Sequence, residues 1–217
     1  MLISNNRTPP LSIAVEGING SGKTTLINKL KEVLRNEGYE PVDLPYKSME
    51  SYKLAITTNN KLDKDKYFRQ AFKDAYSQIV PTLTSKNILI LDRFLISNLV
   101  YRSIDGTEVK GLEELEDNFI KVDTLIYLDC DPKIAFKRIK KRGDDRFNLK
   151  YLELKELKQA RELFITYFRE LGSNDRENIF FLNQRSKFSF FKKYKKFINK
   201  VYKNSKGTSK IVPFCYF

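Results

Sequence analysis

Short apolar runs alternate along the chain with longer segments in which apolar residues recur every three or four positions. Runs of four to eight apolar residues are typical of buried strands, whereas the longer spacing predicts amphipathic helices. The first run spans 11–16, and the helical pattern that follows runs from about Gly22 to Asn36 and stops before Gly38. Strand and helix patterns continue to alternate, which predicts βαβ units and a parallel sheet.

The same criteria place the remaining elements. Four more strands are predicted at 41–44, 87–91, 124–129 and 179–182. Helices are predicted in two pieces within 48–84 separated at 57–61, at 95–103, at 112–119, from Pro132 onwards, at 151–171, and in a final basic segment with Phe191, Tyr194, Ile198 and Val201 facing inward. Pro81 conflicts with the second helical piece, because proline lacks the N–H that a helix interior uses. We expect one α/β domain of five parallel strands at 11–204, an N-terminal arm at 1–10 and a tail at 205–217.

The composition limits the chemistry that the chain can perform. No histidine occurs among the 217 residues, which excludes Ser-His and Cys-His nucleophiles and histidine-based metal sites. The two cysteines, Cys130 and Cys215, are too few for a disulfide framework and wrongly spaced for a zinc site. Catalysis must therefore use lysine, arginine, acidic groups, hydroxyls and backbone amides. This set is sufficient for phosphoryl transfer.

The net charge of +13 is concentrated near the carboxyl end, where 178–217 contains Arg185 and nine lysines but no acidic residue. Such a segment can attract nucleic acid or an anionic membrane. We interpret it as the solvated face of a helix and expect neither partner. No apolar run approaches the length of a membrane span, and the first ten residues lack the features of a signal peptide. A cytoplasmic protein is therefore expected.

Residues 17–24 match the P-loop signature, which consists of Gly, four residues, and Gly-Lys-Ser/Thr. The loop follows a predicted strand and opens a predicted helix, where backbone N–H groups and the helix dipole favour phosphate. Lys23 is expected to contact the β- and γ-phosphates of ATP, and the Thr24 hydroxyl is expected to bind Mg²⁺. The predicted nucleotide-contacting residues are Gly17, Ile18, Asn19, Gly20, Ser21, Gly22, Lys23, Thr24 and Thr25. The motif predicts the P-loop NTPase fold, a three-layer α/β/α architecture.

Several segments resemble the thymidylate kinases in the same order and spacing. They are the loop segment 15–25, Leu44-Pro-Tyr-Lys47, the Asp-Arg-aromatic segment 91–101, the strand and helix start at 122–142, and Asp145-Arg-Phe147. The resemblance covers residues 11–182 and implies a P-loop nucleoside monophosphate kinase with a lid at about 142–150. It also implies Mg²⁺-dependent phosphorylation of a deoxynucleoside monophosphate by ATP, in the first place dTMP to dTDP, by a homodimer.

Catalytic roles are expected for one carboxylate and several cations. Asp92 follows a predicted strand beside the loop, so it can orient the Mg²⁺ shell, together with Thr24, and the attacking phosphate. Arg93 matches the family's arginine that bridges the donor and acceptor phosphates. The acceptor phosphate is already ionised, so no general base is needed. The other cations expected to neutralise charge during transfer are Lys23 and the lid arginines Arg138, Arg142 and Arg146.

The resemblance also implies a set of acceptor-binding residues, of which three depart from the family pattern. Asn19 stands where an aspartate usually binds the 3′-hydroxyl, and Lys47 replaces an arginine and loses its bidentate fork on phosphate. Arg102 replaces a glutamine or small polar residue near the base. These departures concern the identity of the base more than the type of reaction. The full expected set is Asn19, Lys47, Lys73, Arg93, Ser97, Tyr101 and Arg102.

Two other functions remain open at this point. A deoxynucleoside kinase would need a carboxylate base just after the second strand, but Asp43 lies inside that strand and Glu50 in the next helix. It would also carry Glu-Arg-Ser where this chain has Asp-Arg-Phe at 92–94. A non-catalytic P-loop regulator would bind nucleotide and contact nucleic acid through the basic end. The retained lid arginines argue against that function.

Overall fold

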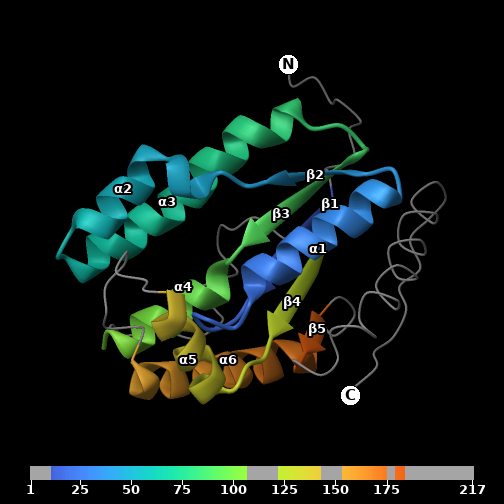
Figure 1. Ribbon diagram of the computed structural model, residues 1–217. Helices are drawn as coiled ribbons and strands as arrows, with labels where there is room; N and C mark the ends of the chain where they lie inside the picture. Colours follow the sequence, from blue (N-terminus) through green and yellow to red (C-terminus); the bar gives the residue numbers. More distant parts are fainter. Residues whose placement is uncertain (1–10, 107–121, 143–152, 175–178, 184–217) are drawn as a thin grey trace.

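The computed structural model describes residues 11–106, 122–142, 153–174 and 179–183. Within them, five strands form one sheet in the order β2-β3-β1-β4-β5, and every neighbouring pair is parallel (Figure 1). The strands are β1 (Leu11–Glu16), β2 (Glu40–Asp43), β3 (Asn87–Asp92), β4 (Thr124–Leu128) and β5 (Ile179–Leu182). The predicted five-stranded parallel sheet of a P-loop fold is confirmed.

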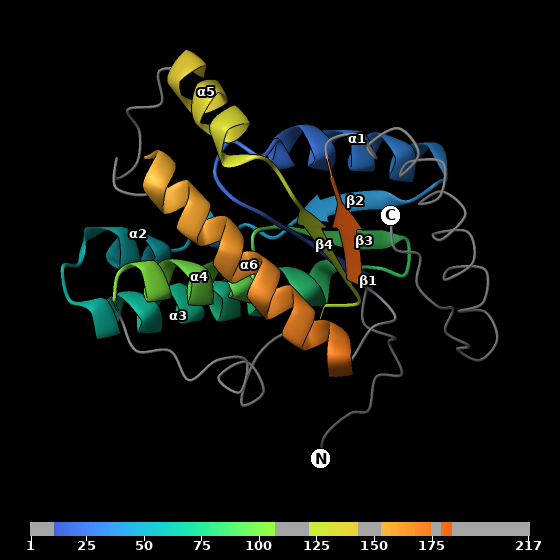
Figure 2. The same cartoon turned by 90° about the horizontal axis from the view of Figure 1, so that it is seen from below.

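Helices lie on both sides of this sheet. In the described ranges they are α1 (Lys23–Asn36), α2 (Glu50–Thr57), α3 (Lys61–Ile79), α4 (Leu95–Ile104), α5 (Pro132–Arg142) and α6 (Leu154–Asn174). Figure 2 shows α1 on one face of the sheet and α3, α4 and α6 on the other, which gives three layers. None of the helices in this part of the chain combines the length and apolar composition that crossing a membrane requires.

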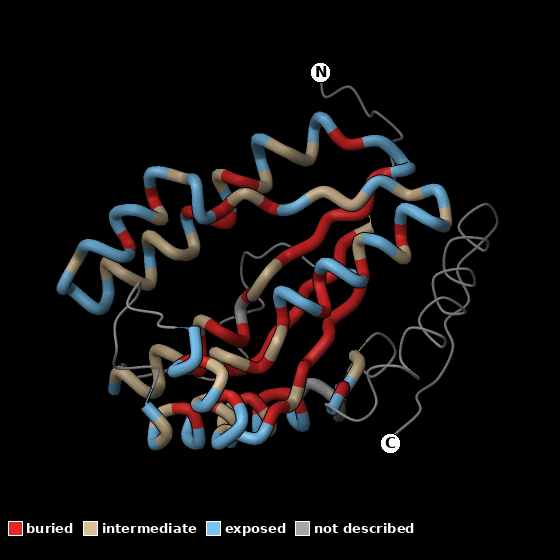
Figure 3. The backbone as a smooth tube through the Cα atoms, viewed as in Figure 1, coloured by how far each residue is buried: buried red, intermediate tan, exposed pale blue. Residues whose placement is uncertain are grey.

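The central strands are buried along their length (Figure 3). Their alternate side chains belong to two separate cores, one on each face of the sheet. In β1, Ile13 and Val15 pack with α1, whereas Ala14 belongs to the core formed with α3, α4 and α6. In β3, Ile90 and Leu91 divide between the two cores in the same way. Burial on both faces explains why the strands read as nearly continuous apolar runs in the sequence.

A break in the helix accommodates Pro81. α3 ends at Ile79, and the chain continues as a short 3₁₀ turn, η2 (Val80–Thr82), with the proline in its first turn. At that position the missing N–H removes no helical hydrogen bond. A second 3₁₀ turn, η1 (Tyr46–Ser48), follows β2.

The other predicted elements within the described residues begin or end close to the observed bounds. Several predictions lie outside the described residues. They are the helix at 112–119, the lid at 142–150 beyond Arg142, the basic helix after residue 183, the arm at 1–10 and the tail at 205–217.

Candidate active site

The P-loop turns tightly between β1 and α1 at the carboxyl edge of the sheet. Gly17, Gly20 and Gly22 have φ angles of 145°, 74° and 98°, a region that residues with side chains rarely adopt. Gly22 immediately precedes α1, whose first turn contains no acidic residue. An anion at this helix end would therefore meet free N–H groups and the positive end of the helix dipole.

The Lys23 side chain lies buried against the loop backbone. Its Nζ donates hydrogen bonds to the carbonyl oxygens of Gly17 and Ile18, at 2.9 and 2.8 Å. Burial lowers the pKa of Lys23 well below its ordinary value and the charge of Arg93 lowers it further, whereas Asp92 raises it. A bound phosphate would compensate this buried charge.

Asp92 ends β3 beside the loop and is held by residues from η1. The Lys47 Nζ donates to Asp92 Oδ2 at 2.9 Å, and the Tyr46 hydroxyl donates to the Asp92 carbonyl oxygen at 2.9 Å. Burial raises the pKa of Asp92, but the charges of Lys47, Lys23 and Arg93 and the hydrogen bond from Lys47 outweigh it and hold the pKa below its ordinary value. The carboxylate is therefore ionised at neutral pH.

The oxygen groups at this edge fit a partly hydrated Mg²⁺. Asp92 Oδ1 is buried and accepts no hydrogen bond from the described residues, and Thr24 is exposed in the first turn of α1. Mg²⁺ is usually held by one or two carboxylates together with substrate phosphates. The described ranges contain no cluster of three acidic, cysteine or histidine side chains suited to a metal. A metal at this edge would therefore depend on the nucleotide for further ligands.

Arg93 joins the turn after β3 to the P-loop. Its Nη1 donates to the Gly17 carbonyl oxygen at 3.0 Å and to Ser97 Oγ at 3.1 Å, and its Nη2 donates to Asn19 Oδ1 at 2.6 Å. The Tyr101 ring centre lies 5.3 Å from the guanidinium carbon. Arg93 has a φ of 75°, and a left-handed conformation costs an L-residue about 1–2 kcal/mol. Five predicted site residues from two motifs, the P-loop and the segment 91–101, thus meet at one place.

Glu16, which the sequence analysis did not select, lies at the centre of this arrangement. Its Oε1 accepts hydrogen bonds from the N–H groups of Phe94 and Ser97, at 2.9 and 3.0 Å, and its Oε2 accepts one from the Ser97 hydroxyl. Burial raises the pKa of Glu16, although the bonds from Ser97 and the charge of Arg93 oppose this. One signal was present in the sequence, namely a carboxylate that ends an otherwise apolar strand directly before the loop.

Two residues of the predicted acceptor-binding set, Lys73 and Arg102, lie on α3 and α4. Lys73 is exposed, while the neighbouring Phe72 is buried and stacks on Tyr46 with 4.1 Å between ring centres. Arg102 Nη1 lies 3.5 Å from Asp65 Oδ2 of α3. The structure therefore places Arg102 in an ion pair between two helices and Lys73 on the surface.

Among the predicted lid arginines, Arg138 contacts the loop directly. Its Nη1 lies 3.4 Å from the Gly20 carbonyl oxygen and 3.3 Å from that of Ser21, as a hydrogen-bond donor to both. Arg142 is exposed at the end of α5, and Arg146 lies outside the described residues. In the sheet, β1 lies between β3 and β4. Arg93, which follows β3, and Arg138 of α5, which follows β4, therefore reach the P-loop from opposite sides.

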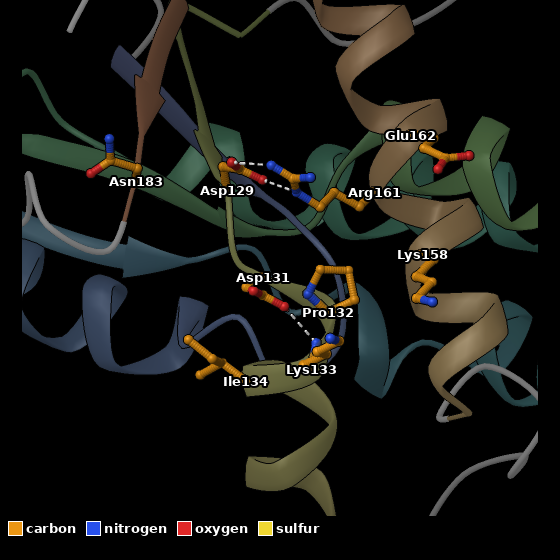
Figure 4. Close-up of a pocket in the computed structure, with 9 residues that line it drawn as sticks. All are labelled: Asp129, Asp131, Pro132, Lys133, Ile134, Lys158, Arg161, Glu162 and Asn183. Atoms are coloured by element: carbon orange, nitrogen blue, oxygen red, sulfur yellow. Dashed lines mark hydrogen bonds and ion pairs between the residues drawn. The ribbon is translucent and has the colours of Figure 1, made fainter.

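A separate hollow of about 660 Å³ lies between the start of α5, α6 and the ends of β4 and β5 (Figure 4). Arg161 of α6 binds the Asp129 carboxylate with both ends of its guanidinium, at 2.6 and 2.8 Å. Asp131 caps α5 by accepting a hydrogen bond from the Lys133 N–H at 2.7 Å. None of the site residues predicted from the sequence lines this hollow.

Comparisons with known proteins bear on both sequence and fold. The family model for thymidylate kinase matches residues 15–186. A probable thymidylate kinase of Archaeoglobus fulgidus is 34% identical over 139 residues, which are 60% of this chain and 70% of that protein. A probable thymidylate kinase of Staphylothermus marinus is 31% identical over 159 residues, which are 70% of this chain and 79% of that protein.

Among solved structures, a deoxyadenosine kinase from M. mycoides, with the products dCMP and a flexible dCDP bound, is similar with a TM-score of 0.63. The match covers 88% of this chain and 100% of that chain. Its sequence identity is 18%, so this likeness concerns the fold alone.

Proposed function

This chain belongs to the thymidylate kinase family, and we propose that it transfers the terminal phosphoryl group of ATP to dTMP, giving dTDP and ADP. The family makes it a nucleoside monophosphate kinase, an enzyme that binds nucleotides. The choice of dTMP is supported by the names of the relatives, and ATP and Mg²⁺ by the P-loop and the oxygen groups beside it.

The observation that carries the proposal is the link between the Asp92-Arg93 turn and the P-loop. Arg93 bonds to the backbone of Gly17 and to the side chain of Asn19, so its guanidinium lies between the phosphate cradle and the α4 side of the site. Lys23 lies against the same carbonyl oxygen of Gly17. Two cations beside the same loop oxygen suit a reaction in which a negatively charged phosphoryl group moves from one phosphate to another.

In the proposed mechanism the protein supplies position and charge. The loop N–H groups and Lys23 bind the donor phosphates, and Arg93 orients the acceptor phosphate toward them. Thr24 and Asp92 would hold Mg²⁺, which when bound neutralises charge on the phosphate oxygens. The lid arginines Arg138, Arg142 and Arg146 would approach the transferred group and exclude water. An ionised acceptor phosphate attacks without a general base, in agreement with the absence of histidine from the sequence.

A nucleoside acceptor is disfavoured by the residues after β2. Its neutral hydroxyl would need a carboxylate base, but the position directly after β2 is the buried Leu44. Asp43 lies within β2, is exposed and is paired with Lys31 of α1. These contacts favour a phosphate acceptor over the nucleoside alternative.

Four further proposals do not rest on contacts in the structure. From the family we infer a closing lid at about 142–150 and a homodimer, and from the sequence a cytoplasmic location, with nucleic acid excluded as a partner. Acceptor-binding roles for Asn19, Lys47, Lys73, Ser97, Tyr101 and Arg102 are part of the same proposal. Size-exclusion chromatography with light scattering tests the dimer, and a monomer at micromolar concentration would refute it.

The reaction is tested by measuring ADP release in a coupled assay with dTMP, dUMP, dCMP and thymidine as acceptors. We expect turnover with dTMP, less with the other monophosphates, and none above background with thymidine. The Lys23→Ala variant is the matched control. It should lose most of the activity but keep its fold, which a cooperative thermal unfolding transition would show. Turnover of thymidine alone would establish the nucleoside alternative, and no turnover of any monophosphate would sink the proposal.

A further inference from the structure

Glu16 is a buried carboxylate that the proposed mechanism leaves without a role. It has no exposed surface and ends β1 directly before the P-loop. An ionised carboxylate is costly to bury unless hydrogen bonds satisfy it. Here the N–H groups of Phe94 and Ser97 and the Ser97 hydroxyl all donate to it. These donors lie at the N-terminus of α4, where a negative charge is also favoured by the helix dipole.

Hydrogen bonds from the end of β1 hold the backbone at Arg93 and at the residue after it. Phe94, whose N–H group Glu16 holds, directly follows the left-handed Arg93, and the Arg93 N–H donates to the Val15 carbonyl oxygen at 3.0 Å. The last two residues of β1 therefore fix the backbone at Arg93 and just after it. A strained conformation of this kind persists only where the surrounding structure over-determines it.

The side chain of Arg93 is tied to Glu16 as well. Ser97 Oγ donates to Glu16 and at the same time accepts a hydrogen bond from Arg93 Nη1 at 3.1 Å. The same Nη1 group reaches the Gly17 carbonyl oxygen at 3.0 Å. A continuous chain of hydrogen bonds thus runs from Glu16 through Ser97 and Arg93 to the P-loop.

We propose that Glu16 is a positioning residue, which holds the Arg93 guanidinium against the P-loop through Ser97 and the Phe94 N–H group. This role rests on the proposed phosphoryl transfer, but it does not depend on dTMP as the acceptor. It assigns to Glu16 a function beyond satisfying the start of α4. Because transfer requires close alignment of two phosphates, a small displacement of Arg93 slows the chemical step.

The test is the Glu16→Gln variant, which keeps the size of the side chain. Its amide oxygen can still accept from both N–H groups, but its NH₂ group faces Ser97 Oγ, which must then accept where it now donates. We expect kcat to fall by about 10- to 100-fold while KM for each nucleotide changes by less than about threefold. A kcat within about twofold of wild type would overturn the proposal.

A matched control separates positioning from stability. Ser12 lies on the same strand, is 4% exposed, and donates to Asp123 Oδ2 at 2.8 Å at the opposite end of the sheet. The Ser12→Ala variant should lower Tm. Its kcat, measured at a temperature well below that Tm, should stay within about twofold of the wild-type value. If the loss of kcat in Ser12→Ala and in Glu16→Gln is proportional to the loss of Tm in each variant, Glu16 has only a structural role and the proposal is wrong.

A second measurement remains informative even if the proposed function fails. Urea unfolding of Glu16→Gln, Ser97→Ala and the double variant tests the hydrogen-bond chain directly, without any activity. We expect the double variant to lose less stability than the two single losses combined, because both remove the same link. Full additivity would break the link between Glu16 and Ser97 and refute the proposal. A wild-type protein that turns over no monophosphate would refute only the proposed function.

Discussion

At the scale of single residues, Lys23 combines burial with a positive charge, and this makes stability depend on pH. Its folded pKa is lowered by burial, so between that value and 10.5 the unfolded chain binds more protons than the folded one. The penalty is complete below the folded pKa, and stability rises as the pH rises through the window. Without nucleotide, Tm should therefore gain more between pH 8 and 10 in wild type than in Lys23→Met, by differential scanning fluorimetry. Parallel pH profiles of the two proteins would contradict this assignment.

Asp92 is the ionised carboxylate that we propose as a ligand of Mg²⁺. We expect Asp92→Asn to lower kcat by roughly 100-fold, because an oriented, charged oxygen ligand is lost, and to leave KM for ATP nearly unchanged. The control is Asp43→Asn on the neighbouring strand, where the carboxylate is exposed and pairs only with Lys31 among the described residues. Steady-state kinetics over a range of Mg²⁺ concentrations measures both. Equal losses in kcat and in nucleotide affinity would count against a role in the transition state.

The low pKa of Asp92 gives a second pH prediction with the opposite sign. A carboxylate whose folded pKa is depressed contributes stability above its unfolded pKa and loses it as the pH falls through the folded value. Wild type should therefore lose Tm more steeply than Asp92→Asn below about pH 4. An identical acid limb in both proteins would show that Lys47 and Lys23 do not stabilise the ionised form.

Motif chemistry was predictable from the sequence, and long-range partners were not. Lys23, Asp92 and Arg93 carry local signatures, and the structure brings them together at one edge of the sheet. Glu16 offers only its place at the end of an apolar strand, and that place does not reveal its partners, which lie 78 and 81 residues away. Lys73 shows a different limit. One residue along a helix turns a side chain by about 100°, so a register uncertain by one position decides whether the lysine or its neighbour Phe72 faces inward.

At the scale of elements, the P-loop and α5 approach each other at Gly20. A Cβ atom on Gly20 would lie 2.5 Å from the Ala135 carbonyl oxygen, and the residue has a φ of 74°. Gly38 is the matched control, because its φ is 86° but nothing lies within 4 Å of an added Cβ. Gly38→Ala should cost about 1 kcal/mol from strain alone, and Gly20→Ala about 1–3 kcal/mol more, because α5 must move. Urea unfolding distinguishes them, and equal costs would show that this contact is loose.

The elements themselves were largely predictable, because burial on both faces leaves a strong apolar signature. β3 and β4 have continuous apolar runs, and the α/β alternation predicts that they belong to a parallel sheet. Their order in that sheet, β2-β3-β1-β4-β5, comes from the structure alone. The helix bounds were less certain. α3 ends at Ile79 because Pro81 cannot continue a helix. The conflict at Pro81 is visible in the sequence. That the chain resolves it with a 3₁₀ turn depends on how it then enters β3.

At the scale of the whole molecule, one sheet supports two cores and carries the site at its edge. Leu34 of α1 and Phe164 of α6 are both fully buried, one in each core, and Phe164 stacks on Tyr127 with 5.5 Å between ring centres. Leu34→Ala should cost about 2–5 kcal/mol and Phe164→Ala about 3–5 kcal/mol. Because the two side chains belong to separate cores, their costs should add within about 0.5 kcal/mol in urea unfolding.

Leu30 and Leu34 belong to the same core and serve as the control pair for this additivity. These leucines lie one helical turn apart in the core that α1 forms, so their combined substitution should depart from additivity as the shared cavity relaxes. A coupling between Leu34 and Phe164 as large as that between Leu30 and Leu34 would mean that the cores respond as one. Strain in either core would then reach β1 and β3, and with them Glu16 and Asp92. Independent cores instead predict that each single variant keeps the KM values of wild type well below its own unfolding transition.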